Sequence, residues 1–142
     1  MSALRVGDLI ETRGGLRVGV VGRYNGQDIS VPLSCLGIKY HGEPLRELDP
    51  PEARTLLADI LSTELAQKSM VMDRAEAEGW ADRILTSVFP ADAKLFTNLN
   101  VLEPSKASSY GWSFDGTDAT FSVGVIAVAR NALGLVWVED ED

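Results

Sequence analysis

The sequence predicts an α+β fold: an N-terminal three-stranded β meander, an antiparallel helix pair, and a C-terminal antiparallel β meander that ends in a hairpin. The first observation behind this is the segment 121–138, where two apolar runs rich in β-branched residues flank a polar break at Arg130 and Asn131. The second is a helical spacing of apolar residues between positions 50 and 89. Since no repeat, linker or composition break divides residues 1–142, we expect a single domain.

Short apolar segments separated by glycines predict the N-terminal meander. The expected strands cover residues 4–10, 16–22 and 28–33. Gly14 and Gly15 suit the tight turn between the first two strands because glycine readily adopts a positive φ. Asn25-Gly26 is a turn signal before the third. Residues 34–48 are expected to form a loop with one extended piece.

The helix pair has the clearest sequence signals. Asp49 is the expected N-cap of the first helix, with Pro in the first turn and Glu52 three residues after the cap. Its apolar stripe consists of Ala53, Leu56, Leu57, Ile60, Leu61 and Leu65. A second helix is predicted from position 72 or 73 to 89, where Pro90 stops it. Gly79 within it indicates either a close helix contact or a break.

The region between the helices and the final hairpin has a weaker pattern. Residues 91–108 show no clear periodicity, residues 110–114 are expected to form a strand, and residues 115–118 a turn. Residues 121–129 and 133–138 are the strands of the hairpin. Whether the N-terminal and C-terminal strands share one sheet is left open.

Composition places the chain among ordinary globular proteins. It has 142 residues, of which 45% are hydrophobic and 24% are charged. No apolar run approaches the roughly 18–20 residues of a membrane span, and Asp8 interrupts any signal-peptide core. The single cysteine excludes an internal disulfide, which favours a cytoplasmic location.

Negative charge is concentrated in the second half of the chain. The net charge is −8; residues 1–71 hold eight Lys/Arg and nine Asp/Glu, whereas residues 72–142 hold five and twelve. This imbalance opposes nucleic-acid binding, which requires cationic surface, and it favours attraction to a basic partner. The alternative is that the charge only keeps the protein soluble.

The residues capable of nucleophilic or metal chemistry form no recognisable motif. Cys35 and His41 are the only residues of their kinds; a cysteine nucleophile needs a base, but the apolar neighbours of Cys35 favour a structural role. One Cys and one His fall short of a structural zinc site. The glycine-rich segment 14–22 is followed by a predicted strand, whereas a phosphate-binding loop precedes a helix. We therefore expect no catalytic, cofactor-binding or metal-binding residue.

Two pairs of acids have the chemistry of acid–base or cation-binding groups. Glu76 and Glu78 lie on the second helix, and Asp115 and Asp118 flank Gly116 in a turn that favours aspartate for local hydrogen bonding alone. The turn lacks the ligand series of a calcium loop.

The terminal acids are the least ordinary feature, since they leave a predicted strand with no flexible spacer. Together with nearby aromatic residues they are the predicted partner-binding residues: Glu139, Asp140, Glu141, Asp142, Trp137, Asp115, Asp118 and Trp112. The predicted function is a non-catalytic acidic binding protein that masks a basic protein partner such as a toxin. Bacterial immunity proteins and antitoxins of similar size and charge work in this way. The alternatives are an enzyme or small-ligand-binding domain with a pocket between the helices and the C-terminal sheet, and an accessory subunit of a larger assembly.

Overall fold

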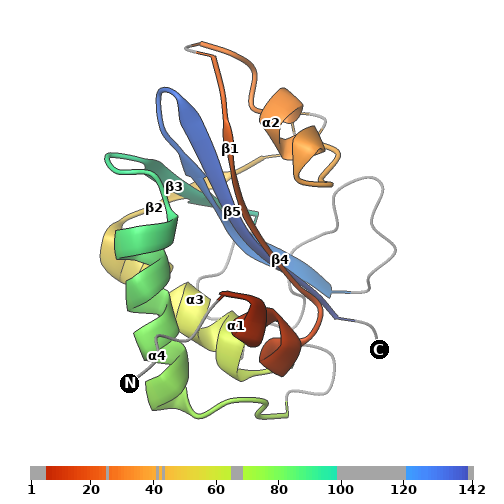
Figure 1. The fold of residues 1–142 in the computed structure, drawn as a ribbon, viewed down its shortest axis with the longest axis vertical. Helices are drawn as coiled ribbons and strands as arrows, with labels where there is room; N and C mark the ends of the chain where they lie inside the picture. The colour runs from red at the N-terminus through yellow and green to blue at the C-terminus, as the bar shows by residue number, and fades with distance from the viewer. Residues whose placement is uncertain are drawn as a thin grey trace.

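A five-stranded antiparallel sheet forms the centre of the molecule, with helices on both faces, so the predicted α+β class is confirmed (Figure 1). The structure is a computed structural model that describes residues 6–140 apart from 25, 41, 43, 65–68 and 99–120. The strand order is β1-β5-β4-β3-β2. The strands are β1 (Leu16–Gly22), β2 (Arg46–Leu48), β3 (Lys94–Thr97), β4 (Phe121–Val128) and β5 (Ala132–Asp140). The helices are α1 (Val6–Arg13), α2 (Ser30–Cys35), α3 (Pro50–Ser62), α4 (Arg74–Arg83) and the π-helix η1 (Ile84–Val88).

The central strands are buried on both faces because each alternate set of side chains meets a different helical layer. Val123, Val125 and Ala127 of β4 pack in one core cluster with α3 and α4. Ile126, which points the opposite way, packs in a second cluster with Leu33 of α2. Both faces of β5 are covered in the same way, so nearly all of its residues are buried and its sequence is mostly apolar.

The helix α3 begins where the sequence predicts. The Asp49 carboxylate accepts a hydrogen bond from the Glu52 backbone N–H at 2.8 Å, and the Glu52 side chain accepts one from the Asp49 N–H at 3.0 Å. This reciprocal capping box satisfies two donors that the first helical turn leaves unpaired. Leu56, Leu57 and Ile60 are fully buried, as the stripe predicts.

The second predicted helix is also present, but its last turn is wider. α4 continues directly into η1, and Phe89 follows in extended conformation before Pro90. Gly79 is exposed, and a Cβ placed there would meet no atom within 4 Å. It therefore marks neither a close helix contact nor a break.

The predicted N-terminal meander is wrong at two of its three strands. Residues 6–13 form α1 and residues 30–35 form α2, and only 16–22 is a strand. The two segments are too short for their apolar spacing to distinguish a helix from a strand. Before α2, the Asp28 side chain accepts a hydrogen bond from the Ser30 N–H at 2.8 Å, which forms a turn where the sequence predicts a strand. The expected extended piece in 34–48 is β2. β3 falls within 91–108, where the sequence indicated no element.

The N-terminal and C-terminal strands share one sheet. β1 pairs with β5 along its whole length, from Leu16 opposite Val138 to Gly22 opposite Ala132. β4 pairs with β5 in the predicted hairpin. The expected strand at residues 110–114 and the turn at 115–118 lie outside the described residues.

Candidate functional site

The first half of the terminal acidic block is neutralised within the chain. Asp140 is buried, and its Oδ2 lies 2.7 Å from Nη2 of Arg13 at the end of α1. The second carboxylate oxygen accepts a hydrogen bond from Nη1 at 3.2 Å. Because this pair is two-pronged and shielded from water, the Asp140 charge is not available to a partner.

The Arg13 side chain also caps the C-terminus of α3. Its Nε donates to the backbone oxygen of Ile60 at 2.6 Å, and its Nη2 donates to that of Thr63 at 3.0 Å. These carbonyls belong to the C-terminal turn of α3 and its cap, where orphan acceptors and the helix dipole attract a cation. A further bond to the oxygen of Gly14 at 3.1 Å engages the last of the five guanidinium N–H donors. The sequence did not suggest this role, because the partners of Arg13 are distant along the chain.

Glu139 has an intramolecular cation as well. Its carboxylate lies 3.5 Å from Nη1 of Arg17 on β1, and its side chain is only 25% exposed. The two described members of the block, Glu139 and Asp140, are therefore paired with arginines of the same chain. Glu141 and Asp142 lie outside the described residues, as do Asp115, Asp118 and Trp112.

Trp137 is a core residue, which corrects its predicted role as a surface contact. It is fully buried, and its Nε1 donates to Oγ of Ser122 at 2.6 Å. The indole lies against Gly124, which is directly opposite on β4, and a Cβ on that glycine would collide with the ring. The ring fills the space that the missing side chain leaves.

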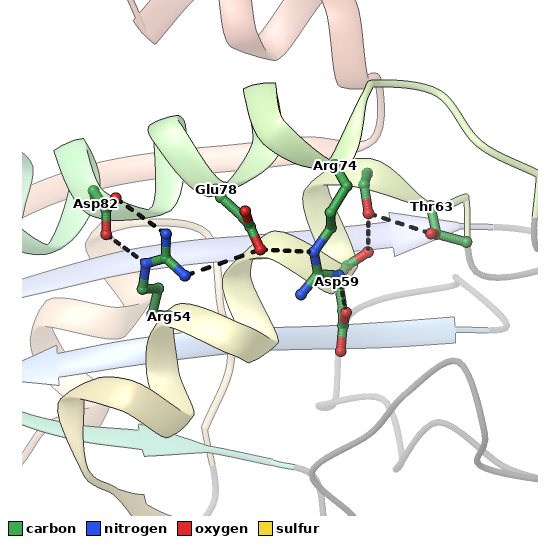
Figure 2. Close-up of polar contacts among 7 residues, drawn as sticks. Arg54, Asp59, Thr63, Arg74, Glu78 and Asp82 are labelled. Atoms are coloured by element: carbon green, nitrogen blue, oxygen red, sulfur yellow. Dashed lines mark hydrogen bonds and ion pairs between the residues drawn. The ribbon is translucent and has the colours of Figure 1, made fainter.

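A row of ion pairs joins the outer surfaces of α3 and α4 (Figure 2). Arg54 Nε donates to Asp82 Oδ1 at 2.7 Å, and Arg74 contacts both Asp59 and, at 3.3 Å, Glu78. Residue 54 lies beside 82 and residue 59 beside 74, so the helices are antiparallel as predicted. The hydrogen bond from Arg54 lowers the pKa of Asp82, and the hydrogen bond to Asp59 raises the pKa of Arg74.

Four acids lie on α1 or at the start of α4, and we call them the α1–α4 acidic rim: Asp8, Glu11, Asp73 and Glu76. All four are exposed. Within the part of the chain that the structure describes, no cation lies at ion-pair distance from Glu11, Asp73 or Glu76.

Asp8 and Glu76 line a cleft of about 80 Å³ with Trp80 and Met72 at its wall. Arg83 stacks over the Trp80 ring, 5.2 Å from its centroid. The sequence singled out Glu76 only as half of an acid pair.

A larger cleft of about 480 Å³ lies on the other face of the sheet, between α2 and the β4–β5 hairpin; we call it the α2–hairpin cleft. It is lined by Gly22, Arg23, Tyr24, Gln27, Val31, Pro32, Cys35 and Asn131. Cys35 is exposed there, which differs from the buried setting that its neighbours in sequence predict. The sequence did not predict this cleft, because its walls come from a helix that was expected to be a strand.

The described residues contain no cluster of three or more His, Cys, Asp or Glu side chains able to hold a metal ion. His41 lies outside them, so the structure does not place it relative to Cys35. None of the helices in the described ranges has the length and apolar character needed to cross a membrane. A scan against protein-family models, a search of curated proteins and a search of solved structures each returned no match for this chain.

Proposed function

We propose that this chain is a non-catalytic acidic binding protein that masks the basic surface of a partner protein. The partner class that fits is a cationic protein toxin, such as a nuclease, which a bacterial immunity protein or antitoxin of this size and charge neutralises. The proposal keeps the predicted function but moves its described contact surface from the chain end to the α1–α4 acidic rim.

The observation that carries the proposal is the distribution of ion pairs over the helical face. Arg54 and Arg74 are engaged by acids of α3 and α4, and Arg13 is buried against Asp140. The rim acids Glu11, Asp73 and Glu76 have no such partner among the described residues. Among the described residues, the charges of Glu11, Asp73 and Glu76 are therefore not offset by an intramolecular ion pair.

The physical consequence of such a rim is long-range attraction. Exposed carboxylates in one region steer a cationic partner and raise the association rate, whereas a buried apolar contact governs dissociation. The rim offers both kinds of contact, because the cleft between Asp8 and Glu76 has Trp80 in its wall. A lysine or arginine of the partner would place its charge beside Asp8 and Glu76 at the mouth of this cleft.

The test compares two double variants that remove the same charge. Glu11→Gln/Glu76→Gln alters the rim, and Glu47→Gln/Asp92→Asn alters exposed acids elsewhere. Asn suits position 92 because the residue has a φ of 61°. Each immobilised protein is exposed to lysate of the source organism and, separately, to a lysine decapeptide as a defined cationic probe. We expect the wild-type and control proteins to retain a basic protein from the lysate. The rim variant should retain less of it or none.

Binding kinetics of the captured protein then separate steering from contact. The association rate of wild type should fall as salt rises, since the Debye length shrinks from about 10 Å at 0.1 M to about 3 Å at 1 M. The rim variant should associate more slowly at low salt with little change in dissociation. Equal binding by the rim and control variants, or retention of no basic protein by wild type, would contradict the proposal. A third variant, Glu141→Gln/Asp142→Asn, measures the contribution of the chain end.

A further inference from the structure

We propose that the α2–hairpin cleft is a binding site for a carboxylate attached to an apolar group, with Arg23 as the residue that recognises the carboxylate. The ligand is either a free small-molecule acid or the carboxyl terminus of a peptide, since both present the same chemistry. This inference does not depend on the proposed function, because the cleft and the α1–α4 acidic rim lie on opposite faces of the sheet.

Arg23 is held in place by backbone oxygens alone. Nη1 donates to the oxygen of Ala129 at 3.0 Å, and Nη2 donates to that of Gln27 at 2.5 Å. These acceptors come from the β4–β5 hairpin and from the loop before α2, so two separate segments fix the plane of the guanidinium. Each terminal nitrogen retains a second N–H, because a guanidinium carries five donors. Nε is buried and has no hydrogen-bond partner in the described part of the chain.

The charge of Arg23 also has no counter-ion among the residues that the structure describes. No carboxylate is among the residues that line the cleft, and no described acid forms an ion pair with Arg23. Arg13, Arg17, Arg54 and Arg74 of the same chain each pair with an acid. In a protein of net charge −8, a partly buried cation that is oriented but not neutralised is suited to an anion from outside.

The remaining walls define the rest of the ligand. Val31 and Pro32 of α2 supply an apolar wall, and the Tyr24 side chain stands 81% exposed at the rim of the cleft. The Gln27 side-chain oxygen accepts a hydrogen bond from the Tyr24 N–H at 3.2 Å, so its NH₂ group is left as a donor. A single cation beside amide donors and an apolar wall matches a monoanion with an apolar body. The volume of about 480 Å³ lies within the range of roughly 300–1,000 Å³ of small-ligand sites.

The single cysteine provides the readout, because Cys35 lines the cleft and is exposed. Its alkylation by iodoacetamide, a neutral reagent, is followed in the presence of 4-phenylbutyrate or of its neutral analogue 4-phenylbutanamide. A probe at ten times its Kd fills about nine-tenths of the sites, so alkylation should slow by up to about tenfold. We expect this protection from the carboxylate and little from the amide. Equal protection by the two would overturn the assignment of Arg23.

The two sources of the carboxylate are distinguished by a second pair of probes, N-acetyl-alanyl-phenylalanine and its C-terminal amide. Stronger protection by the free-acid dipeptide than by 4-phenylbutyrate identifies a peptide terminus as the natural occupant; the reverse order identifies a small-molecule acid. Absence of protection by every carboxylate probe, up to the millimolar range, would refute the proposal.

Two variants tie the effect to the cleft. Arg23→Gln should abolish the preference for carboxylate over amide, whereas Arg130→Gln, an equal charge change at an exposed residue that does not line the cleft, should retain it. Val31→Glu leaves both backbone contacts of Arg23 intact and places a negative charge at the rim, where the side chain is 48% exposed. Val31→Glu should also remove the protection of Cys35 by the carboxylate probe. If Arg23→Gln fails to fold, this variant tests whether the carboxylate binds in the cleft. Neither variant should alter binding of a cationic partner at the acidic rim.

Discussion

Arg13 and Asp140 form a two-pronged buried ion pair although they are 127 positions apart in the sequence. The pair fastens the first described helix to the end of the last strand, and the same guanidinium caps α3. The Arg13 side chain therefore connects α1, α3 and β5, which are far apart in the sequence. An intact buried ion pair contributes little to net stability, because desolvation offsets the attraction between the charges. Removal of one partner is costly, because it leaves the other charge buried and unpaired.

Asp140→Leu should lower the free energy of unfolding by about 3–5 kcal/mol, because it leaves the Arg13 charge buried without a counter-ion. Glu139→Gln is the neighbouring control; its weaker contact with Arg17, at 3.5 Å, should make the cost less than about 1 kcal/mol. Urea denaturation of both variants measures the difference. Similar costs for the two would mean that the Arg13–Asp140 pair is not a specific contact.

Two glycines should respond to alanine with opposite signs. Gly124→Ala places a methyl group against the Trp137 indole and the Val136 backbone, and overpacking of this kind costs about 1–3 kcal/mol. Gly79→Ala adds a methyl group in open space within α4 and should stabilise the protein by about 0.5–1 kcal/mol. Thermal melts of the pair test this; a stabilising Gly124→Ala would show that the ring does not lie over the glycine.

Truncation of the α3 stripe should be costly. Leu57→Ala removes a fully buried side chain between α3 and the sheet, and we expect a loss of about 2–5 kcal/mol in the free energy of unfolding. Thr55→Ala, on the exposed side of the same helix, serves as the matched control and should change stability by less than about 0.5 kcal/mol. A loss for Leu57→Ala no larger than the control would place the stripe outside the core.

The Arg54–Asp82 pair makes a pH-dependent contribution of known sign. Arg54 holds the pKa of Asp82 below its ordinary value of 3.8. Because the pKa of Asp82 is lower in the folded than in the unfolded state, the stabilisation is complete above the unfolded-state pKa of 3.8 and is lost as the pH falls through the folded-state pKa. Carboxyl-carbon NMR should therefore give Asp82 a titration midpoint below 3.8 that rises in Arg54→Gln. An unchanged midpoint would contradict the contact; both groups are exposed, so the effect on global stability is small.

Local signals in the sequence predicted the elements that local physics determines. The capping box at Asp49 and Glu52 and the apolar stripe of α3 fixed that helix from positions a few residues apart. The β4–β5 hairpin was equally readable, since its two apolar runs flank a short polar break. The sequence predicts strands where α1 and α2 form, because these helices have only eight and six residues and are too short for helical periodicity to show.

The candidate sites depend on contacts across the fold, so sequence reasoning recovered less of them. Glu139 and Asp140 stood out as a charge block, but their pairing with Arg17 and Arg13 arises only when β5 lies beside β1. Trp137 was read as a surface aromatic because an apolar strand does not reveal that both of its faces are covered. Arg23 was one arginine among several, and only the meeting of the hairpin with the loop before α2 gives it a fixed orientation.

The sheet order β1-β5-β4-β3-β2 determines when the chain can fold during its synthesis. The inner strands β4 and β5 follow α1, α3 and α4 in the chain, so these helices are synthesised before the sheet surface on which they pack exists. β1 must wait for a partner that follows it by more than 100 positions, as the pairing of Leu16 with Val138 shows. Such sequence-distant pairing slows folding because a large loop must close before contacts form. The sheet therefore forms only after β5 has been synthesised, and until then the apolar faces of the helices have no sheet to pack against.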